Sequence, residues 1–487
     1  MSAEVVPGAP AGRSGVIVAV LAFAGVVVSL MQTLIIPLVP KLPALLHAPA
    51  SDTAWAITAT LLAAAVATPT VGRLGDMYGK RRLLLVSVLA LIAGSVLGAV
   101  SDSLVPMIAG RALQGLSSAV IALGISIMRD ELPAHRLGSA TALMSASLGI
   151  GGALGLPLAA LLAERADWHL LFWASALLGA VVLALVWTLV PESRVRAGGR
   201  FDFTGAAGLS VVLVAVLLAV SKGSDWGWGS GLTLGLLAGA VVVALVWGRW
   251  ELRIRQPLVD LRVTARRQVL LTNLASAVFG FAMFAMSLVL SQLLQLPAET
   301  GYGLGQSLLV VGLVMAPSGL VMMAVAPVSA RLSAARGPKV TLMAGALVVA
   351  IGYALAILLM SAVWQLIVSS CVISAGIGLA YGAMPALVMG AVPVSETAAA
   401  NSLNTLMRSI GTSVSSAVAG VLLAQLTLAS GLPSQNAFRV VLAIGSAAAL
   451  VALCVAAFIP GARRVRPDDL AQAGPVIARP SGAAPRT

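Results

Sequence analysis

The chain has 487 residues, of which 59% are apolar and only 10% are charged, and its mean hydropathy is +1.02. Soluble domains carry about 45 to 50% apolar and about 25% charged residues, so soluble, disordered and fibrous proteins are excluded. The two cysteines, Cys371 and Cys454, lie far apart in apolar runs, which argues against a disulfide framework and against a Cys-based metal site.

Apolar windows bounded by charged residues or by Gly and Pro clusters predict fourteen transmembrane helices. The first apolar run is too long for the core of a cleavable signal peptide, so we expect it to be the first span. In chain order the predicted helices begin near Gly15, Thr53, Leu83, Leu104, Gly138, Trp168, Phe203, Gly231, Gln268, Gly303, Val340, Ala362, Ala398 and Ala437. The predicted class is an all-α integral membrane protein.

Basic residues are distributed unevenly between the two sides of the predicted membrane. With the N-terminus inside, 24 of the 30 Lys and Arg residues lie in cytoplasmic segments and four in external loops, whereas Arg111 and Arg408 lie within spans. The positive-inside rule then places both termini in the cytoplasm. The net charge of +13 is thereby explained by topology. Because no basic cluster lies on a separate soluble domain, nucleic acid is not an expected partner.

An internal repeat appears when 68–84 is compared with 326–342. Matching positions are Pro69 with Pro327, Arg73 with Arg331, Leu74 with Leu332, and Gly79 with Gly337. The repeat predicts two six-helix bundles, at 1–195 and 265–462, an inserted helix pair with its linkers at 196–264, and a disordered cytoplasmic tail at 463–487. Parallel six-helix repeats are a known transporter plan, in which the solute site lies between the halves near the bilayer midplane.

The segment after the second predicted helix, 72–82, reads GRLGDMYGKRR. It resembles the signature loop of the major facilitator superfamily, and an ordinary basic turn is the alternative. Gly75 and Gly79 permit a tight turn, and one acid among four bases can exchange partners as the bundles move. The resemblance implies that Asp76 meets the helix beginning near Ala398 and latches the outward-open state; Ala334 replaces the acid in the second half. The predicted conformational switch contains Gly72, Arg73, Gly75, Asp76, Gly79, Lys80 and Arg81.

Arg111 lies about 10 Å of helix rise inside the outer end of the fourth predicted span. Charged residues within spans are costly and face a polar interior by default, so we expect this guanidinium to project into a cleft between the bundles. Together with Gln114 and Gly115 it is similar to the superfamily's R-x-x-q-G motif, which implies a role in coupling. The alternative is an arginine that reaches back to the outer interface.

The fifth predicted helix is rich in small residues, namely Gly149, Gly151, Gly152 and Gly155, followed by Pro157. It resembles the antiporter motif, although Leu156 interrupts the expected Gly-Pro pair. Close helix packing is the alternative interpretation.

Several weaker marks resemble the fourteen-helix drug/proton antiporter (multidrug efflux) family over nearly the whole chain. They are the aromatic residues 168–173, the segment Phe201-Asp202-Phe203, the turn with Trp226 and Trp228, and the segment from Glu251 to Leu261. This resemblance implies export of amphiphilic compounds, often cationic or neutral, from a bacterial cytoplasm, and hence antibiotic resistance. It implies no cofactor, the proton gradient as energy source, a lipid bilayer as surroundings and a monomeric chain.

Proton coupling requires a titratable group that is exposed alternately to both sides, yet all 17 acids lie at or beyond the predicted span ends. The family usually has an acid in the first helix at the position that Met31 occupies here. We therefore hypothesise that Asp52 or Glu396 titrates with help from Arg111 or Arg408.

Polar residues in otherwise apolar helices mark the predicted solute path: Gln32, Thr33, Asn273, Gln292, Gln295, Tyr381 and Asn404. Met283, Met286 and Met384 would offer adaptable apolar contacts. The alternative is hydrogen bonding between helices, with the methionines as core residues.

The leading prediction is a secondary active transporter that exports amphiphilic molecules by alternating access. The alternatives are a carrier of a sugar, peptide, lipid or metabolite, or one with another form of coupling. An enzyme is not expected, because the sequence offers no paired carboxylates within a span, no metal-spaced His or Cys cluster and no phosphate-binding loop. A sensor that does not transport stays open.

Overall fold

The computed structural model describes residues 11–460, apart from 36–37, 39–41, 54, 166, 194 and 429–431. Within these residues, fourteen helices are long and apolar enough to cross a membrane, which confirms the predicted all-α membrane fold. The tail predicted at 463–487 lies outside the described residues.

The N-terminal bundle consists of α1 (Ala11–Thr33), α4 (Trp55–Tyr78), α5 (Lys80–Ala99), α6 (Leu104–Gly115), the 3-10 turn η2 (Leu116–Ala119), α7 (Val120–Glu131), α8 (Ala134–Arg165) and α9 (His169–Leu189). α6, η2 and α7 form a single span. The inserted pair is α10 (Phe203–Trp226) and α11 (Gly231–Arg253). The C-terminal bundle consists of α13 (Arg267–Gln295), α14 (Leu308–Arg336), α15 (Pro338–Leu358), α16 (Val363–Met389), α17 (Thr397–Gln425) and α18 (Gln435–Ala457). Short elements in the connections are α2 (Leu42–Leu45), α3 (Ala50–Thr53), α12 (Leu261–Thr264), η3 (Ala298–Thr300) and η4 (Val394–Glu396).

The predicted helix starts lie close to the observed ones, and the tenth span differs most. It was predicted to begin near Gly303, whereas α14 begins at Leu308. The preceding residues fold back on α13, because the amides of Gly305 and Gln306 donate to the carbonyl oxygens of Leu296 and Leu294. Ser307 then caps α14 by accepting from the amide of Val310.

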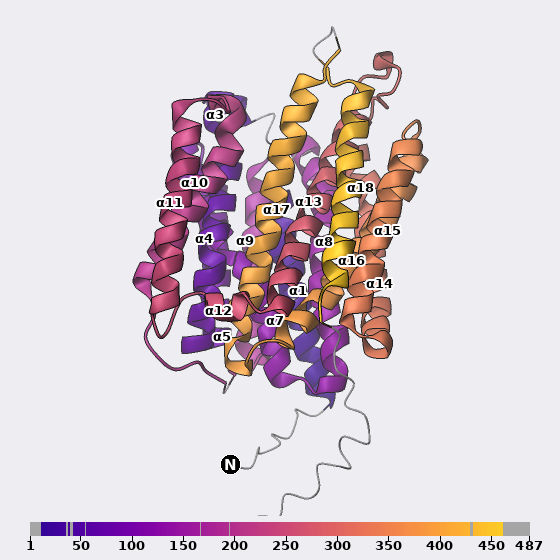
Figure 1. Ribbon diagram of the computed structural model, residues 1–487. Coiled ribbons are helices and arrows are strands. Elements are labelled where there is room, and N and C mark those ends of the chain that lie inside the picture. Colours follow the sequence, from indigo (N-terminus) through magenta and orange to yellow (C-terminus); the bar gives the residue numbers. More distant parts are fainter. Residues whose placement is uncertain are drawn as a thin grey trace, which may run out of the picture.

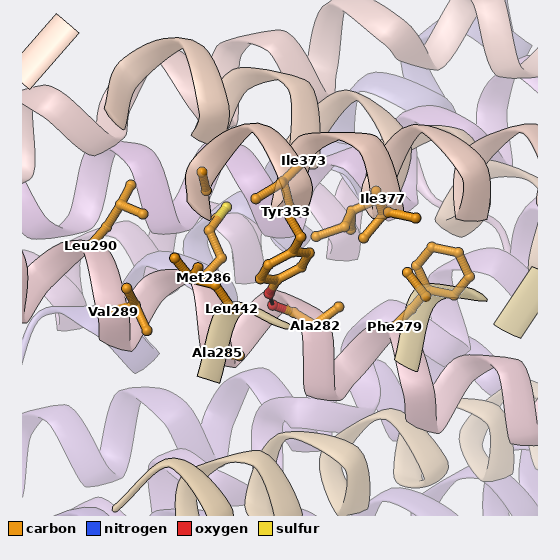
Figure 2. Packing of buried hydrophobic residues seen from close by; sticks show 14 of the residues in the cluster. Phe279, Ala282, Ala285, Met286, Val289, Leu290, Tyr353, Ile373, Ile377 and Leu442 are labelled. Carbon is orange, nitrogen blue, oxygen red and sulfur yellow. Dashed lines mark hydrogen bonds between the residues drawn. The ribbon is translucent and has the colours of Figure 1, made fainter. Parts of the chain in front are cut away.

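Each bundle has its own hydrophobic core. Figure 2 shows the C-terminal one, where the ring of Tyr353 on α15 lies among residues of α13 and α16. Tyr353 is fully buried, and its hydroxyl donates to the carbonyl oxygen of Ala282. This bond matters because a buried phenol without an acceptor would be costly. Met286 lies beside the same ring, and Met384 is buried in the same core.

The two bundles meet mainly along α4 with α17 and α8 with α14, and α8 also contacts α16 while α7 contacts α17. Small residues allow the close approach. A Cβ at Gly72 would lie within 3 Å of Ser402, and one at Gly149 within 3 Å of Met322. Such small-residue crossings are typical of helices packed in a membrane.

The inserted pair lies at the edge of the molecule, with α10 and α11 beside α4 (Figure 1). Leu209, Leu213 and Leu217 recur every fourth residue and so form one face of α10. This face packs against Ala65 of α4 and Leu406 of α17, one residue from each bundle. α10 therefore covers the seam where the bundles meet, whereas α11 is largely exposed.

Candidate functional site

The segment at 72–82, predicted as a loop, is almost entirely helical. α4 continues to Tyr78 and α5 begins at Lys80, so only Gly79 lies between them, with φ of 123°. The prediction of a tight turn at Gly75 was wrong, because Gly75 is helical and its missing side chain makes room for Leu123. In the other bundle Gly337 separates α14 from α15 with φ of 92°. The repeat thus extends to a backbone conformation that favours glycine.

Asp76 lies at the junction of the two bundles. Its side chain is fully buried and accepts hydrogen bonds from the amides of Ala398 (3.2 Å) and Ala399 (2.8 Å), in the first turn of α17. A carboxylate at this position is stabilised by the unpaired amides and the positive end of the helix dipole. The contact implied by the resemblance is present, and its role as a latch stays a prediction.

Lys80 links Asp76 to the end of α7. Its fully buried ammonium group lies 2.6 Å from Oδ2 of Asp130 and 3.6 Å from Oδ1 of Asp76. Asp130 also accepts a hydrogen bond from the hydroxyl of Ser193. A buried cation with two carboxylate partners avoids the large cost of an unpaired buried charge.

Arg129 joins the two bundles through contacts separate from those of Asp76. From the sequence it is predicted only to be one of the cytoplasmic basic residues. Its guanidinium donates to Oγ1 of Thr397 (2.6 Å) and to the carbonyl oxygen of Val392 (3.2 Å). Its position beside Asp130 in the last turn of α7 is the only sequence signal for it. With Asp76 and Arg129 both bound around the start of α17, the face predicted to be cytoplasmic is closed.

The other predicted switch residues occupy distinct places around this closure. Arg73 is buried and lines a cavity of about 290 Å³ between α4, the two connections that flank the inserted pair, and the start of α17. Glu396 lines the same cavity. Arg81 lies over the ring of Trp187, 5.7 Å from its centroid, and also donates to the carbonyl oxygen of that residue.

Arg111 is buried, with 3% of its surface exposed, and its guanidinium points toward the predicted outer ends of α1 and α4, where two of its partners lie. Its guanidinium donates to Oε1 of Gln114 (2.6 Å) and to the carbonyl oxygens of Met31 and Ala56 (3.3 Å each). These partners belong to α1, α4 and α6, so the side chain is held inside the N-terminal bundle. The expectation that it projects into a cleft between the bundles was wrong for this conformation. Gly115, the third residue of the motif, packs closely against α4.

The hypothesised acids do not pair with the arginines of the spans. Asp52 is exposed in α3, and Glu396 lies in η4. Among the described residues, neither acid forms an ion pair with Arg111 or Arg408. The guanidinium of Arg408 instead lies 5.0 Å from the ring centroid of Tyr381. How protons couple stays a prediction.

The predicted solute-path residues are divided between the two bundles. Nδ2 of Asn404 donates to Oδ1 of Asn273 (2.9 Å), which joins α17 to α13. Nε2 of Gln295 donates to Ser291 on its own helix and is exposed, whereas Gln292 is half-buried.

In the N-terminal bundle, Gln32 is exposed and donates to the hydroxyl of Ser118 (3.3 Å), whereas Thr33 donates to the carbonyl oxygen of Leu30 (3.0 Å). Met286 and Met384 belong to the buried core and Met283 packs against it, which is the alternative that the sequence left open for the methionines.

The antiporter-like residues of α8 mainly serve packing. A Cβ at Gly151 would collide with Ser29, and one at Gly155 with Thr33, so both glycines bring α8 close to α1. Gly149 faces α14, and Pro157 lies within α8. Only Gly152 faces open space.

Two weak sequence marks come together in the inserted pair. Asp202 caps α10 by accepting from the amide of Gly205 (2.8 Å) and also accepts from Nε1 of Trp250 on α11 (3.2 Å). Glu251 is 1% exposed, and one oxygen of each carboxyl lies within 2.5 Å of the position that a Cβ at Gly205 would take. No sequence pattern connects these two acids, because they are 49 residues apart and belong to different helix ends.

Comparisons with known proteins agree with this architecture. A model of the Major Facilitator Superfamily matches residues 21–350 and 274–485. An uncharacterized MFS-type transporter of Mycobacterium tuberculosis is 29% identical over 423 residues, which cover 84% of this chain and 59% of that relative. The multidrug resistance protein Stp of the same organism is 27% identical over 373 residues, covering 76% of this chain and 68% of Stp.

The crystal structure of the human organic anion transporter MFSD10 superposes with a TM-score of 0.64 at 17% identity, covering 92% of this chain and 100% of that chain, a likeness of fold alone. The duplicated bundles, the glycine junctions and the match to the family model over most of the chain lead to one conclusion: this chain belongs to the Major Facilitator Superfamily and resembles its fourteen-helix drug efflux family.

Proposed function

We propose that this protein is a secondary active transporter that exports amphiphilic small molecules across the bacterial cytoplasmic membrane by alternating access. Both termini would lie in the cytoplasm, and proton antiport would supply the energy. The observation that carries the proposal is the contact of Asp76 with the amides of Ala398 and Ala399, because it closes one face of the molecule through a few polar contacts. Contacts of this kind can be exchanged when two rigid bundles rock.

The interfaces support such a movement. α8 and α14 meet through small residues at several positions, and no salt bridge joins the side chains of these two helices that the structure describes. Relatives named for multidrug resistance, one named for resistance to and export of tetracenomycin C, and one named a probable actinorhodin transporter favour export of drug-like molecules.

Transport is tested by reconstituting the purified protein in liposomes and imposing a pH gradient. We expect uptake or release of an amphiphilic dye that depends on the gradient and collapses when an uncoupler is added. Empty liposomes and liposomes without a gradient are the controls. Flux that persists unchanged with the uncoupler would contradict proton coupling, and an absence of flux for every solute offered would contradict transport.

The proton carrier is tested in the same liposomes with Asp52→Asn and Glu396→Gln. If either acid carries the proton, its variant should lose the dependence on the pH gradient while still exchanging dye. Asp102→Asn is the matched control, since Asp102 is exposed at the outer end beside His169. Unchanged coupling in both variants would eliminate these two acids.

A further inference from the structure

A basic residue without an acidic partner lies midway along one helix of the C-terminal bundle. Arg408 is the twelfth residue of α17, a helix of 29 residues, and so lies about 16 Å of helix rise from its start. Between Leu261 and Pro460 the only acids are Glu299, in the connection before α14, and Glu396, before α17. A charge at this depth is costly, and such residues serve a function by default.

The surroundings of Arg408 differ from those of the other arginine within a span. Arg111 donates to three oxygen atoms inside its bundle. Arg408 is half-buried, and its recorded contact is with the ring of Tyr381, 5.0 Å away. Among the described residues no carbonyl, amide or carboxylate oxygen accepts from its guanidinium, which has five N–H donors.

Two other donors, one on Tyr381 and one on the partner of Asn404, have no hydrogen-bond acceptor among the described residues. The hydroxyl of Tyr381 is buried and has no hydrogen-bond partner. Asn404, one turn before Arg408, occupies Oδ1 of Asn273, so the buried Nδ2 of Asn273 is left without an acceptor. We call Arg408, Tyr381 and Asn273 the donor cluster. Buried donors without acceptors cost roughly 1 to 3 kcal/mol each, so a group that accepts from them would be stabilised.

We propose that the donor cluster binds the acid group of an anionic aromatic amphiphile, a carboxylate or a phenolate. The acid group would accept from Arg408 and Tyr381. The rings of Tyr381 and Phe279, whose centroids lie 6.4 Å apart, are buried in this conformation, so the aromatic framework would pack on them only after the helices around the cluster separate. The inference rests on the proposed transport function and narrows its substrates to acidic amphiphiles. A permanent cation would meet a like charge at mid-depth, with no acid to offset it.

The test uses two dyes with the same xanthene framework, fluorescein as the anion and rhodamine 123 as the cation. Binding is measured by fluorescence anisotropy at pH 7.5 on the full chain in nanodiscs of zwitterionic lipid, which avoids attraction to a charged surface. We expect the wild-type protein to bind fluorescein at least tenfold more tightly than rhodamine 123. Arg408→Gln should weaken fluorescein binding at least tenfold without weakening rhodamine 123 binding.

Three further variants sharpen the result. Arg408→Lys keeps the charge but not the planar fork and should lose less affinity for fluorescein than Arg408→Gln. Tyr381→Phe should lose about threefold, because it removes one donor and keeps the ring. Arg336→Gln, an exposed basic residue at the end of α14, should change neither dye. The thermal unfolding midpoint of each variant shows whether it is folded.

The proposal is overturned if the wild-type protein binds both dyes equally, if it does not bind fluorescein, or if a folded Arg408→Gln variant binds fluorescein as the wild type does. Flux measurements on the same variants separate this outcome from a failure of the proposed function. Binding of fluorescein that depends on Arg408 without any flux would refute transport and keep the site. Flux of rhodamine 123 without fluorescein binding would keep transport and refute the site.

Discussion

Arg111 combines a buried position with three hydrogen bonds to the surrounding helices, which makes it part of the framework of the N-terminal bundle. Its three acceptors come from α1, α4 and α6, so one side chain ties three helices together. Gln114, which receives one of these bonds, donates in turn to the hydroxyl of Ser95 on α5 (2.8 Å). Removing the guanidinium would break three buried hydrogen bonds from a charged donor, and the carbonyl oxygen of Ala56 would keep only the bond from the hydroxyl of Thr60 among its side-chain partners.

We therefore expect Arg111→Gln to lower the free energy of unfolding by about 2 to 3 kcal/mol. The measurement is thermal or denaturant unfolding in detergent, followed by tryptophan fluorescence. Arg408→Gln is the matched control, since Arg408 donates to no oxygen among the described residues and should cost less than about 1 kcal/mol. An equal loss in the free energy of unfolding for both variants would contradict a stabilising role of the hydrogen bonds made by Arg111.

Gly79 has a backbone conformation that side chains rarely adopt, and the space beside it is occupied. Its φ is 123°, and a Cβ would lie 2.8 Å from Oε1 of Glu192. Gly79→Ala should lower the free energy of unfolding by about 1 to 3 kcal/mol. Gly152 lies within a helix, and no neighbouring atom lies within 4 Å of the position that its Cβ would take. Gly152→Ala should therefore be neutral or stabilising by up to about 1 kcal/mol. A Gly79→Ala protein as stable as the wild type would mean that the junction between α4 and α5 has another accessible conformation.

Hydrogen bonds join the two helices of the inserted pair at their ends near the predicted cytoplasmic face, and we call the bonds from Trp250 to Asp202 and from Trp247 to Gly205 the clasp. Asp202 accepts from Nε1 of Trp250, and Nε1 of Trp247 donates to the carbonyl oxygen of Gly205 (2.9 Å). Both bonds join α10 to α11, so the hairpin is fixed at this end. Because α10 covers the seam between α4 and α17, these bonds attach α11 to the helix that lies over the seam.

The clasp leaves no room for a side chain at Gly205. A Cβ there would lie within 3 Å of both Asp202 and Glu251, so Gly205→Ala must displace a carboxyl group that is buried. We expect it to cost about 1 to 3 kcal/mol in detergent unfolding experiments. Gly235→Ala in α11 is the control, since nothing lies within 4 Å of its Cβ position and alanine favours the helix by up to about 1 kcal/mol. The opposite order of stability would refute the clasp.

The elements that could be predicted from the sequence are those determined by local patterns. Long apolar runs specify spans, and the glycines at 79 and 337 mark equivalent junctions because each requires an unusual φ. Features that depend on which helices become neighbours could not be predicted. The three acceptors of Arg111, the bonds from Arg129 to Thr397 and Val392, and the position of α10 on the seam all join segments far apart in sequence.

At the scale of the whole molecule, the two bundles are separate cores joined by few polar contacts. Each core is built almost entirely from residues of its own bundle, with Met389 and Ala398 of the C-terminal bundle packed into the N-terminal core, so each bundle can move largely as a unit. The contacts of Asp76 and Arg129 with the start of α17 are the polar links at the closed face. The equilibrium between closed and open states therefore depends on a small number of hydrogen bonds, and a single substitution should shift it.

Asp76→Asn provides the most direct test of this dependence. It keeps the size of the side chain but removes its charge, and hydrogen bonds to charged groups are worth about 1.5 to 3 kcal/mol against roughly 1 for neutral ones. A shift of 1.4 kcal/mol changes a two-state population about tenfold. Ser402, fully buried against Gly72 at the same interface, can report the change. We expect a maleimide to alkylate Ser402→Cys about tenfold faster when Asp76 is replaced.

The measurement requires a background without Cys371 and Cys454, and it is made on vesicles whose predicted cytoplasmic face is outward. Arg82→Gln is the matched control, since the guanidinium of Arg82 is exposed and lies 3.8 Å from Glu192, a pair that contributes little. That variant should leave the alkylation rate unchanged. If Asp76→Asn also leaves it unchanged, the carboxylate does not hold this face closed. Closure must then come from Arg129 and from the helix packing between α4 and α17. The contact of Asp76 with α17 would then not determine the equilibrium between the closed and open states.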